Sequence, residues 1–334
     1  MSTLPNDEGL SEVIGFVLLL GVVVALLGMY MVYVVPINGR EDEITQMNYV
    51  EEQFTDYKFT LDAIWTSQLI NTNYANLQSN FGNTLSPAPS IIPATSTTTM
   101  KLGTGSITPQ GGISLPLFQP IASSATLSID NTTDTFTIDS SSYHSSPDNK
   151  GEFPINITSL EYCSNNNYWV QQCDSYEFGG VFLSQDNGNS TINRISPLIS
   201  ITQSANQSAV VNIVPLQIDG NGSYSGNGLV RVDTTQRTLP NYNISESAYV
   251  TNTWVNLSVT SANNATAAMW LQLFRDIAFR EQVSSYIYGS AWNPASRSTT
   301  VFVNITGSNA NPVSLYVQRA EFNVNLNSVA SQFT

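Results

Sequence analysis

The N-terminal part of the chain holds one long apolar run. Residues 13–35 form a stretch of 23 positions without a charged side chain. As a helix this stretch is about 34 Å long, at about 1.5 Å per residue, which is enough to cross a hydrocarbon layer of about 30 Å. Tyr30 and Tyr33 lie near its C-terminal end, where aromatic side chains gather at membrane interfaces. The pattern predicts one transmembrane helix over residues 10–36. A cleaved secretory signal is the alternative, although such signals begin with basic residues and this one begins with acids.

A second helical pattern follows the apolar run. The segment Pro36-Ile37-Asn38-Gly39 is expected to interrupt the helix, with Asn38 as the N-cap of a new helix and Glu41 as its capping-box partner. The pattern predicts a helix over residues 40–78, inside a stalk that covers residues 37–80. Its apolar stripe consists of Met47, Val50, Phe54, Tyr57, Leu61 and Ile64. This stripe packs either against the chain's own β domain or against neighbouring copies, and the spacing fits both.

The remainder of the chain alternates between apolar and polar positions in short runs bounded by turn residues. Residues 81–120 are rich in Ser, Thr, Pro and Gly, and we expect them to form a linker. Strands are expected at 125–129, 135–138, 176–183, 209–216, 229–232, 253–260, 299–305 and 313–326. One helix is expected at 265–286, with Met269, Leu271, Phe274, Ile277 and Ala278 on one side. The predicted fold class is α+β: a long N-terminal helix, then an antiparallel β-sandwich ectodomain over residues 121–334 with one additional helix.

Composition places this domain outside the cell. Charged residues make up 11% of the 334 positions and the net charge is −14. Nucleic acids and anionic membrane surfaces bind clusters of Lys and Arg, so this composition excludes both as ligands. Ser, Thr, Asn and Gln take the place of the missing charges, which is typical of an extracellular surface. We therefore expect the N-terminus inside the cell and the C-terminal domain outside it.

The two cysteines, Cys163 and Cys173, flank a short polar segment. An even count and a short loop favour a disulfide in an extracellular domain. Two buried free thiols are the alternative. A metal site is not expected, because two cysteines and the only histidine, His144, do not make a ligand set.

The start of the chain resembles a known family. A short polar leader ends at Glu8-Gly9, and Leu10-Ser11-Glu12-Val13-Ile14-Gly15 opens the apolar helix. This arrangement is similar to the N-terminus of archaeal type IV pilins and pilin-like proteins. The resemblance implies that a leader peptidase removes residues 1–9 by cutting between Gly9 and Leu10. It also implies that the apolar helix then packs into a filament core with copies of the same chain or with other pilins. Glu8 stands where the family usually has a basic residue, and Ile14 stands where bacterial pilins have glutamate.

Several polar motifs are candidates for binding or modification. Asp219, Asn221 and Ser223 have the spacing of positions 1, 3 and 5 of a calcium loop, and a plain glycine-rich turn is the alternative. Nine Asn-x-Ser/Thr sequons occur, only slightly more than the composition alone would produce. Asn131, Asn189 and Asn221 lie in turn-like stretches and are the better glycosylation candidates.

No catalytic motif stands out. Glu161, Glu177 and the group Asp130, Asp134 and Asp139 contain the carboxylates for a glycosidase-type pair, but scattered acids on strands are usually solvated. We therefore expect no enzyme. The sequence predicts a pilin-like filament subunit in the membrane or in an extracellular filament. The alternative is a permanently anchored adhesin or envelope protein whose β-sandwich binds surface glycans or other cells.

Overall fold

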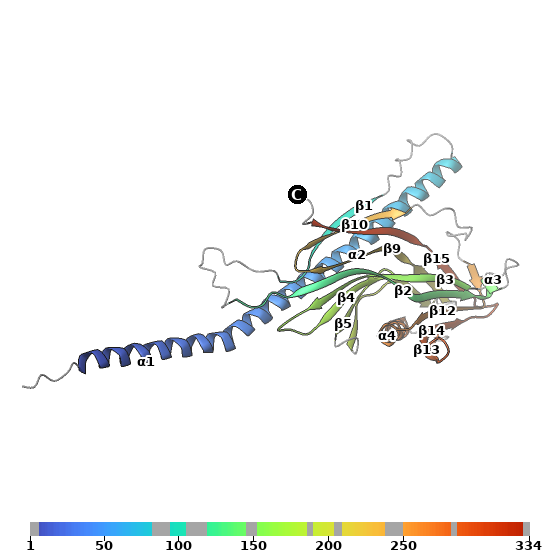
Figure 1. Cartoon of the computed structure of the whole chain (residues 1–334). Helices are drawn as coiled ribbons and strands as arrows, with labels where there is room; N and C mark the ends of the chain where they lie inside the picture. Colours follow the sequence, from blue (N-terminus) through green and yellow to red (C-terminus); the bar gives the residue numbers. More distant parts are fainter. Residues whose placement is uncertain are drawn as a thin grey trace, which may run out of the picture.

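Residues 7–81, near the N-terminus, form one continuous helix (Figure 1). The computed structural model describes residues 7–81, 94–104, 119–144, 152–185, 190–203, 209–237, 250–281 and 286–329. Helix α1 (Asp7–Met29), the π-helical turn η1 (Tyr30–Val34) and helix α2 (Val35–Phe81) follow one another without a break. Outside this helix the chain is mostly β, with short α3 (Ser141–His144) and longer α4 (Asn264–Glu281).

The predicted interruption at residues 36–39 is wrong. Proline lacks an N–H and its ring crowds the carbonyl four residues earlier, which is Val32 in this helix. The turn that contains Val32 is the π-helical turn η1, and a local π adjustment is one way for a helix to re-satisfy the backbone groups that a proline frees. Asn38 therefore lies inside α2 and is not an N-cap.

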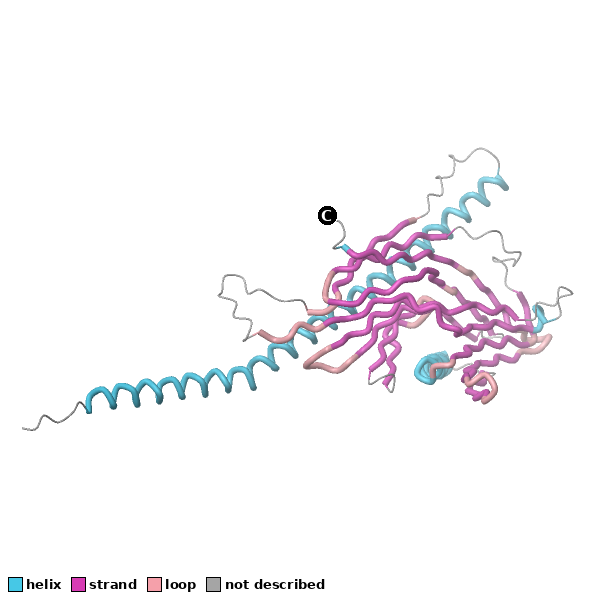
Figure 2. Tube along the Cα trace, in the orientation of Figure 1, coloured by secondary structure: helices cyan, strands magenta, loops and turns pink. Residues whose placement is uncertain are grey.

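Helix α2 lies along one face of a large sheet (Figure 2). Its predicted apolar stripe is buried there, because Phe54 and Leu61 have no exposed surface and Val50 is only 2% exposed. The first of the two alternatives for this stripe, packing against the chain's own domain, is therefore the one that the structure shows. Within the predicted stalk, the stretch from Met47 to Trp65 packs on the β domain.

Among the described residues, the large sheet has twelve strands, and nine of them lie in the order β1-β10-β16-β9-β2-β3-β4-β5-β6. Strands β12, β14 and β13 join it through β2. A second sheet has the order β11-β15-β8-β7. Most pairings are antiparallel, as expected, but β9–β16 and β8–β15 are parallel. The strands are β1 (Thr95–Lys101), β2 (Ser124–Ser140), β3 (Glu152–Asn165), β4 (Gln172–Glu177), β5 (Gly180–Gln185), β6 (Ser190–Ile195), β7 (Leu198–Gln203), β8 (Ala209–Val214), β9 (Leu216–Gly226), β10 (Leu229–Arg237), β11 (Val250–Asn252), β12 (Trp254–Ser261), β13 (Tyr286–Asn293), β14 (Ser298–Thr306), β15 (Val313–Val317) and β16 (Ala320–Ser328).

The large sheet has a separate hydrophobic core on each face. Strand β3 shows how, because successive side chains of a strand point to opposite faces. Leu160 and Tyr162 belong to the core under α2, whereas Ile155 and Ile157 belong to the core under α4 and the second sheet. The layers are thus α2, the large sheet, and then the second sheet together with α4. This confirms the α+β class with sandwich-like sheets.

Several predicted boundaries need correction. The predicted linker, residues 81–120, contains β1, whose β-branched threonines suit a strand. The predicted strand 176–183 is a hairpin, because Phe178 and Gly179 have φ values of 51° and 85° and form the turn between β4 and β5. The predicted strand 313–326 is two strands, β15 and β16, in different sheets. The predicted helix 265–286 is confirmed as α4, although it ends at Glu281.

Candidate functional sites

The first candidate site is the exposed apolar helix. Every large hydrophobic side chain between residues 13 and 34 is between 36% and 68% exposed. No polar face interrupts it, so it differs from an amphipathic helix that lies on a protein surface. Covering these side chains is worth on the order of 20 kcal/mol at about 1.5–3 kcal/mol for a full burial. By length and composition, it is the only helix in the described part of the chain that qualifies as a membrane span.

The predicted leader junction lies at the start of this helix. Gly9 and Leu10 belong to the first turn of α1, and residues 1–6 of the predicted leader lie outside the described residues. The junction is therefore helical in the full-length chain.

A cluster of contacts fixes the other half of the helix to the head domain. Both carboxylate oxygens of Glu43 accept backbone hydrogen bonds from the β3–β4 loop, from Asn167 at 2.6 Å and Tyr168 at 2.8 Å. Gly39 lies against the ring of Tyr168, where an added Cβ would come within 2.4 Å of Cδ2. The guanidinium of Arg40 stacks 4.6 Å above the ring of Trp169. This glycine therefore permits a close approach, although it was expected to be part of a helix interruption over residues 36–39.

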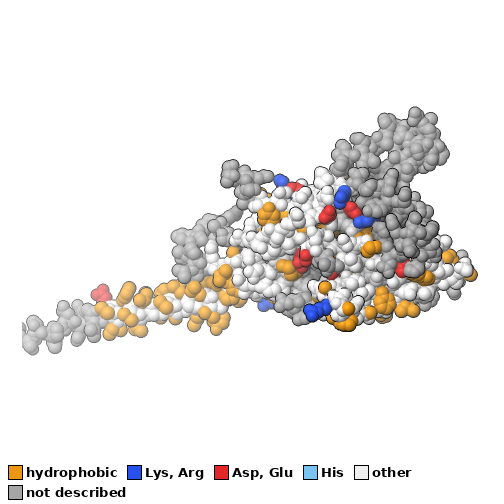
Figure 3. Space-filling model, turned by 45° about the vertical axis from the view of Figure 1, so that its right-hand side comes forward, with side chains coloured by type: hydrophobic (Ala, Val, Ile, Leu, Met, Phe, Trp, Pro, Cys, Tyr) orange, Lys and Arg blue, Asp and Glu red, His pale blue; other side chains and the backbone are white. Residues whose placement is uncertain are grey.

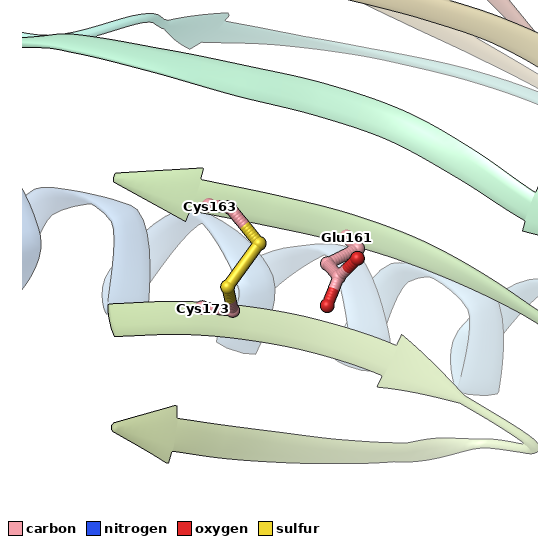
Figure 4. Close-up of side chains that lie close together, drawn as sticks. All are labelled: Glu161, Cys163 and Cys173. Atoms are coloured by element: carbon pink, nitrogen blue, oxygen red, sulfur yellow. A yellow bond between two sulfur atoms is a disulfide. The ribbon is translucent and has the colours of Figure 1, made fainter. Parts of the chain in front are cut away.

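The disulfide prediction is confirmed. Cys163 and Cys173 are bonded across the paired strands β3 and β4, close to the loop that holds α2 (Figure 4). The side chain of Glu161 lies beside them, and its carboxylate and the two sulfurs are within 4.8 Å of one another. Because the disulfide occupies both sulfurs, this group is not a thiolate metal site.

The calcium candidate residues lie in a strand and not in the expected loop. Asp219, Asn221 and Ser223 lie in strand β9, which pairs with β2 and β16 along this stretch. Alternate residues of a strand are about 6.6–6.8 Å apart, whereas ligands of one calcium ion lie about 2.3–2.6 Å from it. The three side chains therefore do not converge on one point. Asp219 instead pairs with Arg237 at 3.5 Å.

The glycosylation candidates have different surroundings from those expected. Asn131 lies in β2 at a bulge, and its amide nitrogen donates to the carbonyl of Gly220 at 3.0 Å. Asn221 is exposed on β9 and lies in a strand. Asn189 lies outside the described residues. Glycosylation itself stays a prediction for all three.

The structure brings four of the scattered carboxylates together. Asp130, Asp134, Glu161 and Glu177 line one pocket of about 110 Å³ beside the start of α4, whereas Asp139 does not line it. The pocket wall also contains five hydroxyl side chains, those of Ser159, Ser175, Ser184, Thr191 and Thr266. The sequence indicated these acids as candidates, but it did not predict that they share one pocket. Their proximity depends on the pairing of β2, β3 and β4.

Burial governs the charges in this pocket. Desolvation raises the pKa of Glu177 to about 7, although a 2.8 Å hydrogen bond from the indole N–H of Trp270 opposes the rise. Desolvation also raises the pKa of Asp134, whose carboxylate accepts a 2.6 Å hydrogen bond from Ser261. The pKa of Glu161 is raised by burial and by the charge of Asp130. Burial thus favours the protonated forms of Glu177, Asp134 and Glu161, which is typical of acid–base sites and equally of carboxyls buried by packing.

Comparison with known proteins found no matching family model, no similar curated protein and no similar solved structure.

Proposed function

We propose that this chain is a type IV pilin-like subunit of an archaeal cell-surface filament and assembles through its apolar N-terminal helix. One observation carries the proposal: a single helix whose first part is apolar all round and exposed, and whose second part is packed on a β domain. The first part needs a cover of lipid or of other helices, and the second part fixes the domain to it.

Both lipid tails and neighbouring apolar helices are suitable surroundings for the exposed helix. In the membrane, Leu and Val side chains contact lipid tails. In a filament, the same side chains contact neighbouring helices, so the exchange costs little hydrophobic free energy. Gly15, Gly21 and Gly28 have nothing within 4 Å of an added Cβ in the single chain, which leaves room for another helix.

The contacts of α2 suit a subunit that must repeat in an ordered array. Glu43, Gly39 and Arg40 all engage the β3–β4 loop just beyond the apolar part. Arg194 of β6 pairs with Glu51 of α2 and lies 3.3 Å from buried Asp174. These contacts couple the orientation of the head to that of the helix.

Leader removal is the proposed trigger for assembly. The leader carries Asp7 and Glu8, and charges of this kind resist transfer into a hydrocarbon layer at a cost of about 2.5–3.5 kcal/mol each. A cut between Gly9 and Leu10 removes both. The shortened helix can then leave the membrane for the filament core.

The experiment is mass spectrometry of the protein isolated from its own cells. The proposal expects an N-terminus at Leu10, and it expects Gly9→Leu to leave the leader in place. Gly21→Ala, in the same helix but away from the junction, is the matched control and should still be cut. A wild-type chain that keeps residues 1–9 in filament preparations contradicts the proposal.

The second candidate is a permanently anchored adhesin or envelope protein in the cell membrane. The acids before the helix favour it, because Glu8 departs from the basic residue usual at a pilin junction. It expects an intact leader and single chains in membrane fractions. A glycan array probed with the full chain in detergent tests the carbohydrate ligand, and an absence of hits counts against that ligand.

A further inference from the structure

Strand β13 is an exposed, uncharged edge of the large sheet. It pairs with β14 over all eight residues, and no other described strand pairs with it. From residue 287 to 293 every side chain except Gly289 is exposed, so both faces of the strand meet solvent as well as its edge. Ile287 and Trp292 are 60% and 55% exposed, and Phe279 at the end of α4 is 73% exposed. Figure 3 shows hydrophobic side chains gathered at the lower edge of the head, where α4 and β13 lie.

Proteins usually protect such edges. Free edge strands attract other strands, and a charged residue or a proline on the strand is the common defence. The two end strands of the main sheet order have this defence, since β1 carries Lys101 and β6 carries Arg194. The sequence of β13, Tyr-Ile-Tyr-Gly-Ser-Ala-Trp-Asn, contains neither a charge nor a proline.

We propose that β13 is a homophilic contact, at which a second copy of this chain adds its own β13 antiparallel to the first. Charge selects this occupant. Two copies with a net charge of −14 repel over most of their surfaces, but β13 brings no charge to the contact. The nearest charged residues along the chain are Glu281 before the strand and Arg297 after it. Antiparallel pairing sets the start of one strand beside the end of the other. Glu281 already pairs with Arg280 at 3.3 Å, so the start of the strand adds no net negative charge to the contact.

The aromatic side chains indicate the strength of the contact. Buried aromatic residues contribute about 150–250 Å² each, so the exposed parts of Phe279, Tyr288 and Trp292 supply on the order of 350 Å² per copy. An interface below about 1,200 Å² in total is a weak one, with a dissociation constant on the order of 100 µM. Many such contacts in parallel bind far more tightly than one.

The position of β13 determines what such a contact joins. It lies at the end of the head that is far from α1 (Figure 1). The contact can therefore link heads whose helices are held in different filaments or membranes. This consequence rests on the proposed function, whereas the pairing of two chains does not.

The test is sedimentation velocity of the full chain in detergent micelles, over protein concentrations up to about 500 µM. Detergent covers α1, so we expect a concentration-dependent dimer. The double variant Ser290→Lys with Trp292→Lys should raise its dissociation constant at least about tenfold, because each copy then brings two positive charges to the pair. Both side chains are exposed, so the fold should be kept, which an unchanged melting curve verifies.

Ile121→Lys is the matched control, because Ile121 is 68% exposed and lies outside α4 and β13. It adds the same kind of charge to an acidic chain and should leave the dimer unchanged. A wild-type chain that stays monomeric at the highest concentration overturns the proposal. Equal dissociation constants for the wild type and the double variant overturn it too.

Cross-linking locates the contact. The chain has two cysteines and both are in the disulfide, so one added cysteine is its only free thiol. Among Tyr288→Cys, Ser290→Cys and Trp292→Cys, at least one should form a disulfide dimer much faster than Ile121→Cys. Equal rates for all four variants contradict antiparallel β13 pairing. Filament assembly through α1 is measured separately, so either proposal can fail while the other stands.

Discussion

The substitution Phe54→Ala tests whether the second part of the long helix packs on the chain's own sheet or contacts neighbouring copies. Its side chain has no exposed surface and lies in the core between α2 and the large sheet. Phe54→Ala removes a fully buried aromatic ring and leaves a cavity, which costs about 3–5 kcal/mol. Phe59 lies on the same helix, is 58% exposed and belongs to neither core. Phe59→Ala should change the free energy of unfolding by no more than about 0.5 kcal/mol.

The assay is denaturant unfolding of the full chain in detergent, followed by near-ultraviolet circular dichroism of the head. We expect a clear fall in the midpoint for Phe54→Ala and none for Phe59→Ala. Equal midpoints for the two variants would refute the packing of α2 on the sheet. A selective loss of filaments with unchanged head stability in Phe54→Ala would show instead that this stripe contacts neighbouring copies.

Three further perturbations test local parts of the structure. Replacing Cys163 and Cys173 together by Ser should lower the free energy of unfolding by about 2–3 kcal/mol, because the disulfide closes a loop with a sequence separation of 10. Denaturant titration measures this change, and an unchanged free energy of unfolding contradicts a stabilising role of the disulfide. Gly39→Ala should destabilise the head by about 1–3 kcal/mol, because the new methyl group meets the ring of Tyr168. Gly15→Ala should not destabilise it, because its methyl group meets nothing within 4 Å. Equal melting temperatures of the two variants argue against the close approach of Gly39 to Tyr168. Burial raises the pKa of Glu177 from 4.5 to about 7. Between these two pH values the folded chain still binds this proton, whereas the unfolded chain has lost it. The free energy of unfolding therefore falls as the pH rises from about 4.5 to 7. In Glu177→Gln, the fall in the free energy of unfolding between pH 4.5 and 8 should be smaller by on the order of 3 kcal/mol, as read from unfolding midpoints. A variant with the full wild-type pH dependence contradicts the raised pKa of Glu177.

Local patterns predicted the elements that local physics controls. The apolar stripe from Met47 to Leu61 and the face of α4 with Phe274 and Ile277 follow helical spacing, and both are buried as that spacing requires. The disulfide could also be predicted from the sequence, because the two cysteines flank one hairpin loop. The predicted strand 176–183 misses the turn at Phe178 and Gly179, because apolar residues lie on both sides of that turn.

Long-range pairing accounts for what the sequence did not reveal. The acidic pocket depends on the register between β2, β3 and β4, in which Ser128 lies opposite Glu161 and Glu161 lies opposite Ser175. Similarly, Asp219 and Asn221 looked like loop ligands because Gly is frequent in turns, but pairing with β16 extends them into a strand. Nothing in the local sequence states which strand will be the neighbour.

The proposed function depends most on what covers the exposed apolar helix. The most direct measurement is electron microscopy of the protein as isolated from its own cells, after mass spectrometry has located its N-terminus. We predict filaments in which α1 lies at the centre and the β domains lie outside. Single chains in membrane or detergent, with the leader already removed and no filaments at any protein concentration, would contradict the proposal.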